Sequence, residues 1–133
     1  MLDVADGGAS SGLRGTIHRP ALDADVLDEL EDLAGTSDLI AELAEVFLAD
    51  AEIQVTVLEV SLAGADSARL AHAAHQLRGS AANVGAAELA RLCSLLPTGD
   101  GPLDESGVAL VLSALRTELS RVRSAFSERV SPR

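Results

Sequence analysis

The chain has 133 residues, of which 47% are hydrophobic, 23% charged and only 2% aromatic, as expected for one folded domain whose core of Ala, Leu and Val suits close-packed helices better than a β-sandwich. A single cysteine, Cys93, excludes a disulfide framework or a thiolate zinc site within one chain, and the lack of a signal pattern or an apolar run of ~20 residues favours a cytoplasmic protein with no membrane segment. The net charge of −11 argues against nucleic acid as a ligand.

The first part of the chain divides into a leader and two predicted helices. Residues 1–20 are rich in Gly, Ser and Asp and lack periodicity, which predicts a disordered leader closed by Pro20. A short helix is predicted over 23–33, where Leu27, Leu30 and Leu33 recur at helical spacing, and Gly35 ends it. The next helix begins after Thr36 or Ser37 as N-cap and ends near Gly64. Its predicted apolar stripe consists of Ile40, Leu43, Phe47, Ala51, Leu58 and Leu62.

Three further helices complete a predicted domain over 21–128, with a tail over 129–133. Asp66 caps a helix that runs to about Val84 or Gly85, a short helix covers 87–96 and is stopped by Pro97, and a loop over 97–102 leads to a last helix over about 104–128. One side of the last helix carries Val108, Val111, Leu112, Leu115, Leu119, Val122 and Phe126. Long amphipathic helices with short links predict an all-α antiparallel bundle.

The charges are distributed unevenly along the chain. Residues 21–66 contain thirteen acids and no base, whereas residues 67–87 contain no acid and carry Arg69, His72, His75 and Arg78. There is no lysine, so every permanently charged basic side chain is an arginine. The helix predicted over 67–84 therefore differs electrostatically from the half-chain before it.

A helical wheel of this segment places His75 away from the core. Leu70, Ala73, Leu77, Ala81 and Val84 form the inward stripe, and His75 lies on the opposite side at about 100° per residue. This geometry disfavours the ordinary interpretation of such a residue as a buried, hydrogen-bonded histidine. A surface histidine without a role remains open from the wheel alone.

The neighbours of His75 favour a functional interpretation. They are small (Ala68, Ala71, Gly79 and Ala82), where an exposed helix face ordinarily carries long polar side chains. Gly79 costs about 1 kcal/mol relative to Ala inside a helix, and it removes a Cβ that would obstruct an approaching partner. Arg78, three residues after His75, reaches the same space and suits a negatively charged adduct on the ring.

Three kinds of chemistry could use an exposed histidine on this face. A metal site is disfavoured because His72 and His75 have no carboxylate near them in sequence, so we expect no metal site. Acyl transfer would need an orienting acid and an oxyanion donor set, and neither accompanies His75. Phosphoryl transfer fits better, because a neutral imidazole is a good nucleophile near pH 7 and a local cation favours the product. The segment lacks Mg²⁺ carboxylates and a phosphate-binding glycine loop, so a partner would supply metal and activation.

Residues 71–96, AHAAHQLRGSAANVGAAELARLCSLL, closely resemble the signature of histidine-containing phosphotransfer (Hpt) domains. That signature has an Ala-His dipeptide, then x-Leu-Lys-Gly-Ser-(Ser/Ala), a Gly-Ala pair and a Leu-x-x-Leu-Cys stretch. The matching positions are Ala74, His75, Leu77, Arg78, Gly79, Ser80, Ala81, Gly85, Ala86, Leu89, Leu92 and Cys93, with a looser match upstream at Leu43, Phe47, Asp50, Leu58, Asp66 and Leu70. The resemblance covers about 21–127, and its central motif is specific.

The resemblance implies a four-helix bundle with a short N-terminal covering helix. It implies that His75 is the phosphoacceptor, through Nε2, and that it exchanges a phosphoryl group with the aspartate of receiver domains in a phosphorelay. Arg78 stands where the family has Lys, which keeps the charge but replaces a point charge with a planar guanidinium. Gly79 carries over as the residue that gives a partner clearance, and Cys93 is expected to fill the core.

The expected partners are receiver domains of response regulators or hybrid histidine kinases, without nucleic acid or membrane, and the chain is expected to be a monomer. It is expected to be a phosphocarrier rather than an enzyme, with no cofactor of its own and Mg²⁺ only in the partner. Antiparallel pairing about Gly64 brings Ile53 and Gln54 level with His75. These two residues, His72 and Ala82 are candidates for partner docking. Ordinary packing is the alternative for both Ile53 and Gln54 and is slightly favoured, since Gln54 falls within the apolar stripe of its helix.

Two alternatives remain. A histidine kinase presents its phosphoacceptor on a helix pair where His is followed by Glu-Leu-Arg-Thr-Pro, whereas this chain has His-Gln-Leu-Arg-Gly-Ser and no room for an ATP-binding domain. A helical interaction module in which His75 is never phosphorylated is the other alternative.

Overall fold

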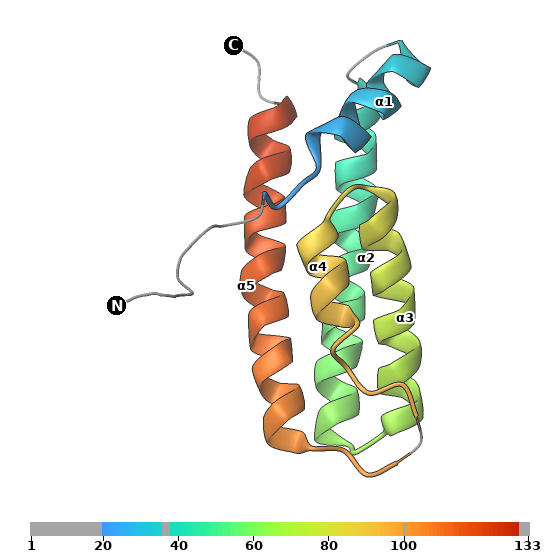
Figure 1. Ribbon diagram of the computed structural model, residues 1–133, viewed down its shortest axis with the longest axis vertical. Helices are drawn as coiled ribbons and strands as arrows, with labels where there is room; N and C mark the ends of the chain where they lie inside the picture. Colours follow the sequence, from blue (N-terminus) through green and yellow to red (C-terminus); the bar gives the residue numbers. More distant parts are fainter. Residues whose placement is uncertain (1–19, 36–37, 100, 131–133) are drawn as a thin grey trace, which may run out of the picture.

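The computed structural model describes residues 20–35, 38–99 and 101–130. Within these ranges the chain forms five helices and no strand: α1 (Ala24–Ala34), α2 (Asp38–Ala63), α3 (Ser67–Asn83), α4 (Ala87–Cys93) and α5 (Glu105–Val130). Figure 1 shows α2, α3 and α5 as long, upright helices with the shorter α4 among them and α1 near one end. This arrangement confirms the all-α bundle with a covering N-terminal helix. The predicted leader before Pro20 and the candidate N-caps Thr36 and Ser37 lie outside the described residues.

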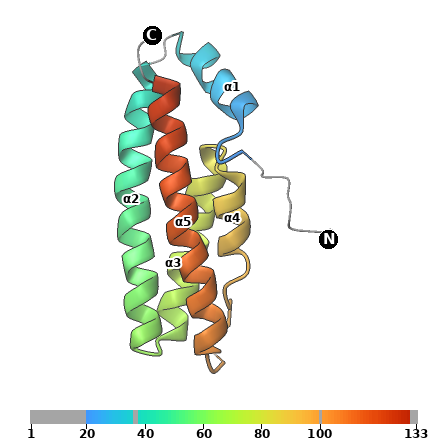
Figure 2. The same ribbon diagram turned by 90° about the vertical axis from the view of Figure 1, so that its left-hand side faces the viewer.

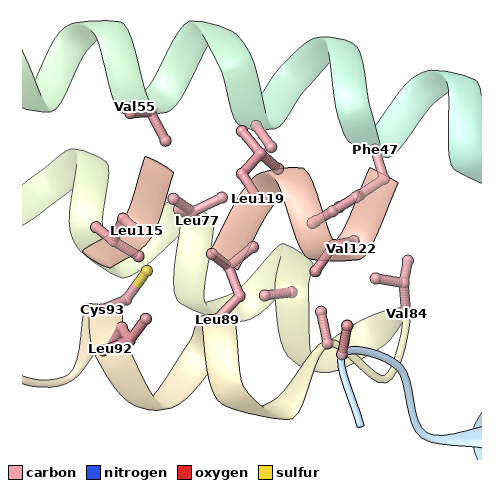
Figure 3. Packing of buried hydrophobic residues seen from close by; sticks show 14 of the residues in the cluster. Phe47, Val55, Leu77, Val84, Leu89, Leu92, Cys93, Leu115, Leu119 and Val122 are labelled. Atoms are coloured by element: carbon pink, nitrogen blue, oxygen red, sulfur yellow. The ribbon is translucent and has the colours of Figure 1, made fainter. Parts of the chain in front are cut away.

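The four main helices enclose one core. α2 packs against α3 and α5, and α4 packs against the same two helices from the other side, while α1 contacts α2. Figure 2 shows the bundle from its flank, with α1 at the end where α2 begins and α5 finishes. Side chains from the different helices meet in the middle, as Figure 3 shows for Val55, Leu77, Leu89, Cys93, Leu115 and Leu119.

The turn between α3 and α4 also anchors α1. Gly85 adopts a left-handed φ of 80°, and the N–H of Ala86 donates to the carbonyl of Ala81 at 2.8 Å, which closes α3 with a Schellman motif. The carbonyl of Gly85 accepts a hydrogen bond from the N–H of Asp23 at 2.7 Å. A Cβ on Gly85 would lie 3.1 Å from Cβ of Val26, so this position needs glycine for both its backbone angle and its close contact with α1.

Three details differ from the sequence-based expectations. α4 ends at Cys93 instead of residue 96, because the N–H groups of Leu95 and Leu96 bond three residues back and Pro97 disfavours a helical residue before it. Leu33 is 85% exposed, and the residue that α1 buries is Leu27. α2 buries Val55, which the predicted stripe omitted, and leaves Leu43 and Leu62 only partly buried.

Ion pairs join the acidic helices to α5. Arg116 donates to Glu52 at 2.7 Å and to Glu59 at 2.9 Å, and Arg123 donates to the second oxygen of Glu52 at 2.9 Å. Arg129 near the end of α5 pairs with Asp28 and Glu31 of α1. The hydrogen bond from Arg116 lowers the pKa of Glu59. The acids that precede residue 66 are thus partly neutralised by α5.

None of the described helices combines the length with the apolar character that a membrane crossing requires.

The turn between α2 and α3 yields a stability prediction. Ala65 has a left-handed φ of 54°, and the N–H of Asp66 donates to the carbonyl of Ser61 at 2.8 Å, so Ala65 occupies the position that favours glycine. We expect Ala65→Gly to raise the free energy of unfolding by about 1 kcal/mol, because the left-handed conformation strains an L-residue by roughly that amount. Urea denaturation measures the change. Ala49→Gly, on the exposed face within α2, serves as the control and should lower stability by about 1 kcal/mol; a loss of stability in both variants would contradict the prediction.

Candidate functional site

Helix α3 divides into a buried face and a bare face. Asp66 starts the helix, since its Oδ1 accepts the backbone N–H of Arg69 at 3.1 Å. The inward residues are Leu70, Ala73, Ala74, Leu77 and Ala81, all at most 6% exposed. The residues on the opposite side are exposed: Ala68, His72, His75, Arg78, Gly79 and Ala82. The inward stripe fixes the rotation of α3 and therefore fixes which residues face outward.

His75 is exposed on this bare face, as the helical wheel predicts. Among the described residues its side chain has no hydrogen-bond or ion-pair partner. The imidazole is therefore exposed at the surface and is not held by a polar contact with the described residues. A nucleophile for an external substrate requires this arrangement, whereas a structural histidine would be bonded within the fold.

Gly79 lies one turn after His75, and nothing in the chain's own fold requires a glycine there. It is an ordinary helical residue without a left-handed backbone angle, and a Cβ built on it would meet no atom within 4 Å. A helix-interior glycine still costs about 1 kcal/mol relative to alanine. The clearance role of Gly79 therefore stays a prediction, and the open space above this residue is compatible with it.

Arg78 is exposed beside His75 and makes no ion pair with the described carboxylates. Its positive charge lowers the pKa of the buried Cys93 thiol in α4. Burial raises the pKa of Cys93 to about 12, and Arg78 offsets this only in part. Cys93 thus remains a neutral thiol in the core, as its expected packing role requires, and Arg78 keeps its charge free at the surface.

The docking candidates occupy different environments. Ile53 on α2 is 60% exposed although it is a large apolar residue, while Gln54 beside it is half-buried. His72 and Ala82 are exposed on α3, one turn before His75 and two turns after it. Equal distances from the α2–α3 turn place Ile53 level with Leu77 along the bundle axis, within one turn of the level of His75. Gln54 is turned partly toward the interior.

The described residues contain no group of three or more His, Cys, Asp or Glu side chains placed to hold a metal ion. Sequence reasoning assigned no role to Arg69, which is exposed on α3 and makes no ion pair within the described chain. The signal that would have found it is the regular three-residue spacing of Arg69, His72, His75 and Arg78.

Comparisons with known proteins found a matching family and a similar solved structure. The Hpt domain family matches residues 42–125. The crystal structure of histidine-containing phosphotransfer protein B (HptB) from Pseudomonas aeruginosa PAO1 is similar to this chain with a TM-score of 0.72 and 28% sequence identity, over 87% of this chain and 100% of HptB. No curated protein matches the sequence significantly. From the matched residues and the shared helical bundle, the chain belongs to the Hpt domain family, whose role is histidine phosphotransfer in two-component signalling.

Proposed function

We propose that His75 accepts a phosphoryl group from the phosphorylated aspartate of one receiver domain and passes it to the aspartate of another. The observation that carries this proposal is the combination of an exposed, unbonded His75 with a Gly79 whose missing Cβ faces open space. The match of residues 42–125 to the Hpt domain family supports it, because that stretch includes both residues.

The transfer step is a displacement at phosphorus. The lone pair of Nε2 of His75 forms the N–P bond while the P–O bond to the donor aspartate breaks, and the aspartate leaves as a carboxylate. The ring keeps the proton on Nδ1, so it becomes cationic until that proton is lost to water. Donation to a second receiver reverses these events, with the imidazole as leaving group. Arg78 is the cation of this chain that stabilises the phosphoryl oxygens in both directions.

The chain contributes the nucleophile, a cation and clearance, and the receiver contributes the rest. We propose that Mg²⁺ and the activation of the phosphoryl group belong to the receiver domain, because no acidic residue lies on α3. The chain then has no ATP or metal site and acts as a monomeric phosphocarrier in the cytoplasm. Ile53, His72 and Ala82 form the docking surface around His75, with Gln54 at its edge. The partners are receiver domains of response regulators or hybrid histidine kinases.

The first prediction tests the acceptor. A receiver domain carrying a labelled aspartyl phosphate should transfer label to the wild-type chain and to His72→Gln, and none to His75→Gln, because His75 carries the attacking nitrogen. The label should be labile to acid and stable to base, as a phosphoramidate is. Mass spectrometry under non-acidic conditions locates it.

Other outcomes favour the alternatives. Absence of transfer from every receiver domain in the panel would favour an interaction module without phosphorylation. Self-labelling from ATP alone would favour a histidine kinase fragment. Equal labelling of His75→Gln and the wild type would assign the acceptor elsewhere.

The second prediction concerns clearance. Gly79→Gln should slow phosphoryl exchange by about tenfold or more, since its side chain occupies the space above the helix through which the partner approaches. It should not destabilise the fold, because Gln is the better helix former by several tenths of a kcal/mol. Quenched-flow transfer and urea denaturation measure the two effects. Ser124→Gln on the exposed face of α5 is the control, and exchange at the wild-type rate in Gly79→Gln would contradict the clearance role.

The third prediction concerns Arg78. Arg78→Ala should slow transfer or shorten the phosphohistidine lifetime by about tenfold, because a charge-assisted hydrogen bond to the phosphoryl group contributes at least ~1.5 kcal/mol. Arg78→Lys should keep most of the wild-type transfer rate and phosphohistidine lifetime, since it keeps the positive charge. A transfer rate and a lifetime that both stay unchanged in Arg78→Ala would show that the guanidinium takes no part.

A further inference from the structure

The arginines of α3 differ from the other arginines that the structure describes. Arg91, Arg116, Arg121, Arg123 and Arg129, on α4 and α5, each form an ion pair with a glutamate or aspartate. Arg69 and Arg78 form none with any described residue. In a chain with a net charge of −11, these two cations are left uncompensated although carboxylates are abundant.

Their spacing places them on a line through the phosphoacceptor. Arg69, His72, His75 and Arg78 are each three residues apart, so successive members step back by about 60° around the helix. The line crosses the bare face diagonally and extends about 14 Å along the axis. Arg69 and Arg78 are nine residues apart, about 180° around the helix, so they lie at opposite edges of this face.

Arg69 has no evident task inside the fold. Its backbone N–H caps the helix by donating to Oδ1 of Asp66, yet its guanidinium makes no ion pair with that carboxylate. It is exposed and does not belong to the buried core. It is also about 9 Å along the axis from His75, beyond contact with a phosphoryl group on that ring. A guanidinium at this distance from His75, without an ion-pair partner among the described residues, could bind an anionic group of a partner protein outside the reaction centre.

We propose that Arg69 is a docking residue that binds a carboxylate on the partner's surface beside the phosphorylated aspartate, and thereby orients the receiver over His75. Charge complementarity identifies this partner chemistry, because α3 bears two arginines and no acid, whereas α1 and α2 bear acids and no base. The inference rests on the proposed phosphotransfer function and adds a second contact to it. Arg78 stabilises the phosphoryl group, whereas Arg69 speeds the association of the two proteins.

The test measures phosphoryl transfer from labelled receiver domains to the full-length chain at low and high salt. Arg69→Gln should lower the second-order rate constant by about fivefold at low ionic strength, and the difference should fade at high salt as the charges are screened. At saturating receiver concentration the single-turnover rate should equal that of the wild type, and so should the phosphohistidine lifetime. Arg69→Lys, which keeps the charge, should behave as the wild type.

Ser124→Glu is the matched control, because it changes the net charge by the same amount as Arg69→Gln on the exposed face of α5, a helix that does not pack against α3. If Ser124→Glu lowers the second-order rate constant as much as Arg69→Gln does, the slowing is caused by net charge alone, and the inference is overturned. An unchanged second-order rate in Arg69→Gln would also overturn it, as would a slowing that persists at saturation and high salt. Each of these results leaves His75-dependent transfer by the wild type intact, while absence of transfer to the wild type would overturn the proposed function and this inference together.

Discussion

The burial of one face of α3 is the constraint on which the site depends. Leu70, Leu77 and Ala81 are fully enclosed by the neighbouring helices, and they hold the rotation of the helix to a single value. Because side chains in a helix are separated by fixed angles, this burial also fixes the outward direction of His75. Rotating His75 inward would expose leucines, at a free-energy cost of roughly 2 kcal/mol for each large side chain. The reactive face is therefore a consequence of the core packing and needs no bonds of its own.

Two glycines show how the requirements of the fold differ from those of a partner. Gly85 has a left-handed backbone and approaches α1 so closely that a Cβ would press on Val26. Gly79 has neither feature, and the space above it is open. The first residue is thus explained within the molecule. Gly79 lowers the stability of α3 relative to alanine, and no contact among the described residues needs a glycine there. The approach of a partner protein, proposed above, would account for it.

The ion pairs divide the described arginines into those that pair with a carboxylate of the chain and those that do not. Arg116 pairs with Glu52 and Glu59, and these hydrogen bonds raise the pKa of Arg116 further above its usual range. Such half-exposed pairs contribute little to the free energy of unfolding. Their clearest consequence is the distribution of charge over the surface of the bundle. α5 partly neutralises the acids of α1 and α2, while the arginines of α3 form no ion pair with any described carboxylate. An acidic partner would be repelled over most of this surface and attracted along the line through His75.

Much of the site could be predicted from the sequence because it is local. The outward position of His75, its nearness to Arg78 and the small residues around it follow from helix geometry within a dozen neighbouring residues. The end of α3 at Gly85 follows in the same way from backbone preference. The sequence also indicated the family through residues 71–96, which form one continuous motif on α3 and α4.

Other features depended on contacts between distant parts of the chain. The partners of Arg116 lie 57 and 64 residues away, so no spacing rule reveals which arginines are neutralised and which remain free. Leu33 continues the helical apolar pattern of α1 yet is exposed, because no neighbouring helix covers that turn. Sequence by itself determined the outward direction of His75 and the absence of acids on α3, since both arise within one helix. Only the tertiary structure decided that Arg69 has no ion-pair partner among the described residues, since that depends on where distant carboxylates lie in the folded chain.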